Sequence, residues 1–136
     1  MPVEAKEIIR IAAAVIVRRG AVLTVRKHGG TRFMLPGGKY EADEAPLECL
    51  ARELDEELGV GVASAEALGR FEAPAADHPE ATVVADVFVV EASGEPRPQA
   101  EIAEARWITP GQTEAPPLAQ LLETQVFPAL LGRAAR

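Results

Sequence analysis

Three glutamates, Glu53, Glu56 and Glu57, lie within five residues of one another in the middle of the chain. The surrounding sequence has helical periodicity, and a helix turns by about 100° per residue, so the three side chains share an arc of about 100°. Carboxylates held so close repel one another, which makes sense chiefly if a cation neutralises them. Oxygen ligands without histidine or cysteine favour Mg²⁺, with Mn²⁺ possible, over zinc. The spacing therefore predicts a divalent metal site; the competing interpretation is an acidic helix face exposed to water.

The helix that positions these glutamates is predicted over residues 44–58. Asp43 is the expected N-cap, and Gly59, which can adopt the left-handed conformation, is the expected C-cap. Pro46 is compatible with this helix because it falls in the first turn, where backbone N–H groups have no partner within the helix. Apolar residues at three- and four-residue intervals form one stripe that should pack against a sheet: Leu47, Leu50, Ala51, Leu54 and Leu58.

The glutamates belong to a longer pattern that starts at Gly38 and ends at Val60. The segment GKYEADEAPLECLARELDEELGV has a glycine, a glutamate after five further residues and, after seven more, Arg-Glu-Leu-x-Glu-Glu-x-Gly-Val. A chance match in a chain of this composition is expected on the order of once in a million. The segment resembles the Nudix box at every fixed position: Gly38, Glu44, Arg52, Glu53, Leu54, Glu56, Glu57, Gly59 and Val60. The small size and the LPGGK entry resemble the mutator-type enzymes of that family.

The resemblance implies a role for most of these residues. In Nudix hydrolases the box forms a loop, a helix and a second loop, and its glutamates bind divalent metal together with a backbone carbonyl, here that of Gly38. Arg52 would orient a metal-binding glutamate, and Glu44 would support it through a two-point guanidinium–carboxylate contact. The family reaction is attack by water on a phosphorus of a diphosphate bridge, assisted by metal. Family members differ in which carboxylate is the base, so Glu53, Glu56 and Glu57 all stay candidates.

A second pair of acids lies outside the box. Glu101 and Glu104 occur in AEIAEARWI, which resembles a family segment where acidic residues precede a tryptophan at the start of a strand. In the family a late carboxylate there often binds metal or acts as the base. The alternative is two exposed loop acids. Trp107 is expected to pack in the core, because it stands between Arg106 and Ile108 in strand-like alternation.

The resemblance implies an α/β fold, the Nudix α/β/α sandwich around a mixed β-sheet. A chain of 136 residues that is 48% hydrophobic fits a single domain, residues 1–136. Residues 8–17 and 21–26 should form a hairpin around Arg19 and Gly20, and the valine-rich strand 82–91 should be central. The other expected elements are an extended segment at 32–35, strands at 67–73 and 105–109, and a helix at 118–131 interrupted at Pro128.

Composition and charge limit the partners. The formal net charge is −7 and no lysine or arginine cluster with aromatic residues offers a track for nucleic acid, so a polymer substrate is disfavoured. The apolar run 11–17 is too short to cross a bilayer and lacks the layout of a signal peptide, so no membrane association is expected. The only cysteine, Cys49, cannot form an intramolecular disulfide; we expect a packing residue and a reducing cytoplasm. His28 and His78 are given no role.

The substrate depends on loops and strands outside the box. The first expectation is a small phosphorylated nucleotide, either a nucleoside triphosphate or an oxidised one. ADP-ribose or another nucleoside diphosphate sugar is the alternative, because Pro74 stands 15 residues beyond Gly59, as in an ADP-ribose subfamily. An alternative of another class is a nucleotide-binding regulator without catalysis, which a box retaining every fixed acid disfavours. A homodimer is possible, since dimers are common in the family.

Overall fold

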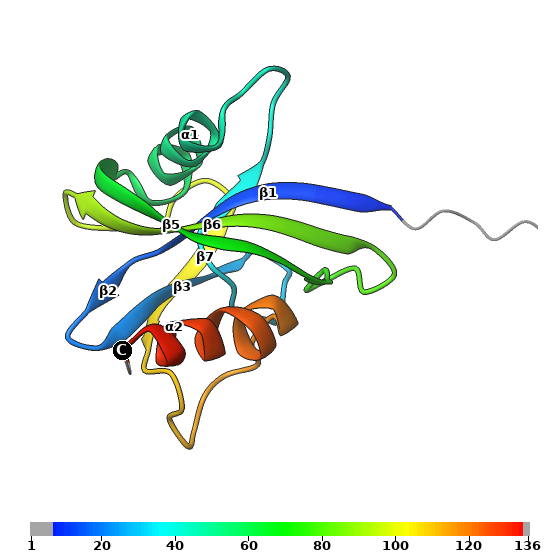
Figure 1. The fold of residues 1–136 in the computed structure, drawn as a ribbon, viewed down its shortest axis with the longest axis vertical. Coiled ribbons are helices and arrows are strands. Elements are labelled where there is room, and N and C mark those ends of the chain that lie inside the picture. Colours follow the sequence, from blue (N-terminus) through cyan, green and yellow to red (C-terminus); the bar gives the residue numbers. More distant parts are fainter. Residues whose placement is uncertain (1–6, 135–136) are drawn as a thin grey trace, which may run out of the picture.

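The strands form two sheets, and helices lie on two sides of them. The computed structural model describes residues 7–134. In chain order the elements are β1 (Ile8–Val15), β2 (Val17–Arg18), β3 (Ala21–Lys27), β4 (Gly37–Lys39), α1 (Pro46–Leu58), β5 (Gly61–Pro74), β6 (Thr82–Ser93), β7 (Ile102–Ile108), the π-helix η1 (Leu121–Val126) and α2 (Phe127–Ala134). Figure 1 shows α1 on one side of the strands and the C-terminal helices on the other. The expected α/β/α arrangement is confirmed.

The larger sheet is mixed and has the strand order β4-β1-β6-β5. β1 runs parallel to β6, from the pair Ile8↔Thr82 to the pair Val15↔Val89, and antiparallel to β4. β6 therefore lies between two strands, as its valine-rich sequence predicted. The smaller sheet has the order β2-β3-β7, and both of its pairings are antiparallel.

β1 separates two hydrophobic cores, because successive side chains of a strand point to opposite faces of the sheet. Ala12 and Ala14 belong to the core that contains the apolar residues of α1. Ala13 and Val15 belong to the core that contains the C-terminal helical segment. All four are fully buried, so β1 is covered on both faces and fixes the position of its neighbour β4.

α1 begins later than predicted. It starts at Pro46 with Ala45 as the N-cap, rather than directly after Asp43. Pro46 explains the shift, because its fixed φ and missing N–H suit the first helical position. Asp43 lies in the preceding loop with a φ of 62°. The predicted C-cap is confirmed, since Gly59 has the left-handed φ of 67°.

The apolar stripe of α1 is buried at its three later leucines but exposed at Leu47 and at Ala51. Leu50, Leu54 and Leu58 are fully buried, whereas Leu47 is 47% exposed. Including Leu47 and Ala51 in the packed stripe was wrong. Helical spacing gives the direction of a side chain around the helix axis, but it does not say whether another layer lies opposite that residue.

The strand predicted over residues 8–17 divides between the two sheets. β1 ends at Val15 and β2 begins at Val17, so only β2 forms the expected hairpin with β3. Arg19 and Gly20 make the turn with φ of 52° and 79°, which suits a tight hairpin. The division could not be predicted locally, because the partners of β1 are β4 and β6, which follow much later in the chain.

Most other strand boundaries also differ from the predictions. β5 begins at residue 61 rather than 67, β6 ends at 93 rather than 91, and β7 covers 102–108 rather than 105–109. Register shifts in β5, between Val62 and Ser64 and between Ala67 and Gly69, interrupt the alternation on which the prediction relied. Residues 32–35 contribute isolated bridges, Val25↔Met34 and Phe33↔Leu118, in place of a strand.

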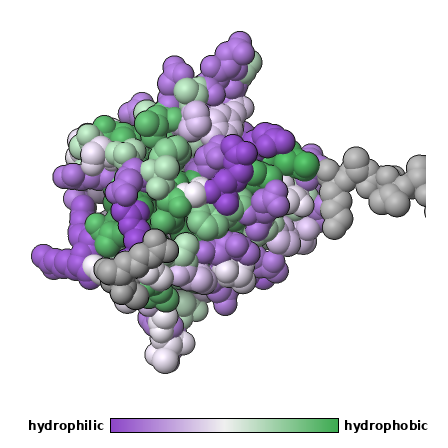
Figure 2. Space-filling view, in the orientation of Figure 1, coloured by the Kyte–Doolittle hydropathy of each residue, from purple (hydrophilic) through white to green (hydrophobic). Residues whose placement is uncertain are grey.

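The C-terminal helical segment changes type close to the predicted interruption. It begins as η1 at Leu121 and becomes α2 at Phe127, one residue before Pro128. Proline has no N–H to donate, which disturbs the hydrogen-bond ladder at this point. On the face that Figure 2 shows, hydrophobic residues are interspersed with hydrophilic ones. Within residues 7–134, no helix combines the length and the apolar character needed to cross a bilayer.

Candidate active site

Glu57 is a buried carboxyl group at the C-terminal end of α1. The residue is only 6% exposed, and its Oε1 accepts a hydrogen bond from the Gly37 N–H at 3.0 Å. Burial raises the pKa of Glu57 to about 7, the Gly37 hydrogen bond acts in the opposite direction, and the negative charge of Glu53 raises the pKa further. A cation bound beside this carboxyl group would offset the free-energy cost of ionising it.

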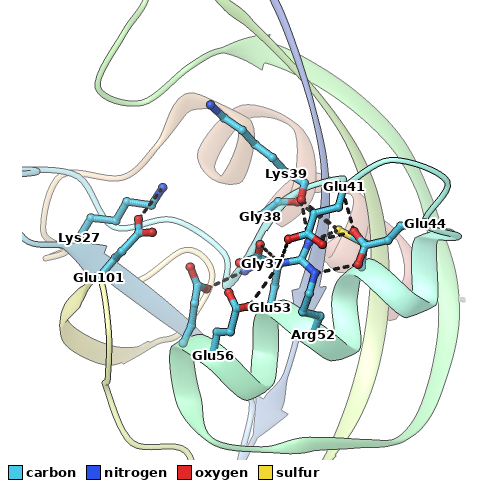
Figure 3. Close-up of polar contacts among 12 residues, drawn as sticks. Lys27, Gly37, Gly38, Lys39, Glu41, Glu44, Arg52, Glu53, Glu56 and Glu101 are labelled. Carbon is cyan, nitrogen blue, oxygen red and sulfur yellow. Dashed lines mark hydrogen bonds and ion pairs between the residues drawn. The ribbon is translucent and has the colours of Figure 1, made fainter.

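Arg52 lies between several carboxylates, as Figure 3 shows. Its guanidinium donates to both oxygens of Glu44, at 2.7 and 2.9 Å. It also donates to Glu53 Oε1 at 2.8 Å and to the Lys39 carbonyl oxygen at 3.0 Å. The hydrogen bonds from Arg52 lower the pKa of Glu44 to about 2. Arg52 therefore ties α1 to the loop before it and fixes one oxygen of Glu53.

β4 at Gly37 and Gly38 passes so close to its neighbours that only glycine fits. A Cβ on Gly38 would lie 2.3 Å from Cδ of Glu53, and a Cβ on Gly37 would lie 2.1 Å from the Ala12 carbonyl oxygen. The backbone of Gly38 is therefore in direct contact with the Glu53 carboxylate. Cys49 also contacts β4, because its Sγ donates to the Gly38 carbonyl oxygen at 3.4 Å.

Cys49 is a packing residue, as expected. It is fully buried in the core beneath α1. Burial raises the pKa of its thiol to about 11, and the negative charge of Glu44 adds to this effect. The thiol therefore stays protonated near neutral pH and is a poor nucleophile.

A cleft of about 460 Å³ opens beside the acidic face of α1. Its polar lining includes the three box glutamates Glu53, Glu56 and Glu57. Within residues 7–134, no three Asp, Glu, His or Cys side chains converge closely enough to form a ready-made metal cage. The side chain of Glu56 is 54% exposed and lies 3.6 Å from an Arg52 guanidinium nitrogen, whereas the side chain of Glu53 is 14% exposed. These hard oxygen donors and the close-lying Gly38 backbone fit Mg²⁺ or Mn²⁺ better than zinc.

Glu101 and Glu104, which the sequence could not separate, lie in different surroundings. Glu101 lines the cleft, and its carboxylate lies 4.0 Å from Lys27 Nζ. Glu104 lies in β7 outside the cleft lining, 3.4 Å from a guanidinium nitrogen of Arg26. The register shift between Arg26 and Lys27 separates the two ion pairs. Figure 3 shows the Lys27–Glu101 pair beside the box glutamates.

Sequence reasoning missed two cationic residues of the cleft, Lys27 and Lys39. Each stands at the end of a short strand, and only the positions of those strands bring both to the same cavity. His78 also lines the cleft, but Glu80 lies 2.8 Å from its Nδ1. Trp107 packs against the core as expected, with the Arg18 guanidinium 4.7 Å from the centre of its ring.

Comparison with known proteins identifies related chains. Residues 8–130 match the family model of the NUDIX domain. A MutT-like protein of Streptomyces ambofaciens is 30% identical over 125 residues, covering 91% of this chain and 77% of that protein. An 8-oxo-dGTP diphosphatase of Haemophilus influenzae is 38% identical over 72 residues, covering 49% of this chain and 53% of that protein. The crystal structure of a MutT NUDIX hydrolase from Burkholderia pseudomallei is 26% identical, with a TM-score of 0.74 over 89% of this chain and 99% of that chain.

Proposed function

We propose that this chain, which belongs to the Nudix hydrolase family and so acts on phosphoanhydride bonds, is a Mg²⁺-dependent pyrophosphohydrolase of nucleoside triphosphates. Residues 1–136 would form one catalytic domain. The proposal rests on one observation. The buried carboxyl group of Glu57 lines the cleft together with Glu53 and Glu56. A buried carboxyl group beside two further carboxylates at one cavity favours the binding of a cation there.

The residues of the box would share the work of holding the metal. Glu53, Glu56, Glu57 and the Gly38 carbonyl would be the ligands, and Mn²⁺ could replace Mg²⁺ because both prefer oxygen donors. The bound metal would neutralise charge on the phosphate oxygens and lower the pKa of an attacking water. Arg52 and Glu44 would act as positioning residues, since Arg52 fixes Glu53 and Glu44 fixes Arg52.

Other residues of the cleft would meet the remaining parts of the substrate. Lys27 and Lys39 could donate to phosphate oxygens. Of the two late acids, Glu101 is the candidate for the general base or a further metal ligand, because its side chain lines the cleft and that of Glu104 is held by Arg26. Water attack would release a phosphate-bearing fragment, and a carboxylate at this place could accept the proton.

A nucleoside triphosphate, normal or oxidised, is the proposed substrate. The cleft volume of about 460 Å³ is in the range of small-molecule sites. Relatives named as a MutT-like protein and as 8-oxo-dGTP diphosphatases support this choice. ADP-ribose or another nucleoside diphosphate sugar is the second candidate, favoured by the position of Pro74 in the cleft wall. A regulator without catalysis is not retained, because the box keeps every fixed acid.

Two broader expectations stay proposals. The lone buried Cys49 fits a reducing cytoplasm. A homodimer is testable by analytical ultracentrifugation, in which a sedimentation mass near 14.4 kDa would indicate a monomer instead.

The test is a turnover panel of (d)NTPs, oxidised dGTP, ADP-ribose and dinucleoside polyphosphates, run with Mg²⁺, with Mn²⁺ and with EDTA. We expect release of pyrophosphate or phosphate from triphosphates with either metal and none with EDTA. Faster turnover of ADP-ribose than of every triphosphate would favour the second candidate. Lack of turnover on the whole panel by well-folded protein would overturn the proposal.

A further inference from the structure

The cleft follows β1 from the glutamates to the loop between β5 and β6. At one end Gly37, whose N–H binds Glu57, pairs with Ala13 of β1. At the other end Ile9 of β1 pairs with Val83, next to the β5–β6 loop. Four strand residues span about 13 Å. If the phosphates lie beside the glutamates, the sugar and the nucleobase extend toward that loop.

The loop end of the cleft has mainly aliphatic walls, including Ile9, Val83, Pro74 and Leu121. Among the residues that the structure describes, the cleft lining contains no Phe, Tyr or Trp and no side-chain amide or hydroxyl. Apolar walls discriminate weakly between ligands of equal size, whereas a group that hydrogen-bonds the ligand discriminates strongly. The choice of nucleobase therefore depends on the few polar side chains at this end.

Asp77 and His78, both on the β5–β6 loop, are the polar side chains at the loop end. His78 is engaged, because Glu80 and Glu7 lie 2.8 and 3.9 Å from its two ring nitrogens. Asp77 lines the cleft, and its carboxylate lies close to Gly30 of the loop after β3, where a Cβ would be 2.9 Å from Oδ2. Within residues 7–134, Asp77 makes no hydrogen bond or ion pair through its side chain, which leaves its oxygens available to a ligand.

We propose that Asp77 selects the nucleobase by accepting a hydrogen bond from an exocyclic amino group. A carboxylate can only accept, so it favours the amino edges of cytosine, adenine and guanine. It disfavours uracil and thymine, which present a carbonyl oxygen where cytosine presents an amino group. This inference rests on the proposed function, because it needs the triphosphate to bind with its phosphates beside the glutamates.

The sharpest test compares dCTP with dUTP, because the two bases have nearly equal size and differ in an amino group against a carbonyl. We expect kcat/KM for dCTP to exceed that for dUTP by about 10-fold or more, as for one hydrogen bond to a charged group. In Asp77→Asn the ratio should fall toward one, because an amide both donates and accepts. Glu72→Gln is the matched control, since it removes an exposed charge from β5 near the same loop but outside the cleft lining, and it should keep the ratio.

A binding measurement gives a second readout without turnover. Calorimetric titration with dCMP and dUMP should show the same preference in the unmodified protein and lose it in Asp77→Asn. Equal kcat/KM for the two triphosphates, or a preference that Asp77→Asn leaves unchanged, would overturn the role of Asp77 alone. Absence of both triphosphate turnover and monophosphate binding would overturn the proposed function as well.

Discussion

Replacing Glu57 with glutamine should remove most of the activity and, at the same time, stabilise the metal-free protein above neutral pH. Glutamine has nearly the same shape, and its amide oxygen can still accept the hydrogen bond from Gly37. It cannot carry the negative charge that a metal ligand supplies. Side chains that bind metal or substrate are often costly to the fold, so a gain of stability with a loss of turnover identifies such a residue.

The magnitude follows from the burial of this carboxyl group. The pKa of Glu57 is raised from 4.5 to about 7, so its ionisation at pH 8 costs about 3 kcal/mol of folding free energy. The unfolded chain releases the proton near pH 4.5, whereas the folded chain keeps it until about pH 7. Because the folded state binds more protons between these values, stability falls as the pH rises through this window.

Urea unfolding of the metal-free protein in EDTA measures this effect. Glu57→Gln should be more stable than the unmodified chain by about 3 kcal/mol at pH 8, and most of the gain should vanish at pH 5. Turnover with Mg²⁺ should fall by orders of magnitude in the same variant. Asp55→Asn is the matched control, because Asp55 is an exposed acid of the same helix outside the cleft lining. Near-normal turnover would refute the metal role, and an unchanged stability at pH 8 would refute the cost of burial.

Three further predictions follow from the contacts of the site. In Arg52→Lys the single ammonium cannot replace the two-point guanidinium contact with Glu44, so Mn²⁺ affinity measured by calorimetry should fall about 10- to 100-fold. An unchanged affinity would contradict the positioning role of Arg52. Glu101→Gln should reduce kcat more than Glu104→Gln, because only the first side chain lines the cleft, and the opposite order in steady-state kinetics would reverse the assignment. Cys49 should react slowly with iodoacetamide at pH 8 in the folded protein and rapidly in urea, which mass spectrometry can measure. Rapid labelling of the folded protein would contradict the burial of Cys49.

Predictions that depend on local spacing were the most accurate. The 3.6-residue period placed α1, and the left-handed preference of glycine placed its end at Gly59. The start of α1 was wrong because two local signals competed, and the geometry of Pro46 prevailed over the capping preference of Asp43. The hairpin turn at Arg19 and Gly20 was likewise a local feature and was confirmed.

Features that depend on distant pairing could not be predicted from the chain. The division of residues 8–17 between two sheets required knowledge of β6, and the register shifts in β5 concealed its length. Glu101 and Glu104 are three residues apart in the sequence, yet the pairing of β7 with β3 sets Glu104 opposite Arg26 and leaves Glu101, just before β7, beside Lys27 at the cleft. Such pairings are decided by which strands meet, and no nearby residue encodes them.

The sequence by itself determined the chemistry of this protein, because the spacing of the box from Gly38 to Val60 is a property of one helix and its two flanking turns. Carboxylates on one helical arc share a face whatever the rest of the chain does. The tertiary structure alone decided that Glu57 is buried and that Lys27 and Asp77 line the same cleft as the glutamates. These facts depend on layers of the fold that meet only after β1 has paired with β4 and β6.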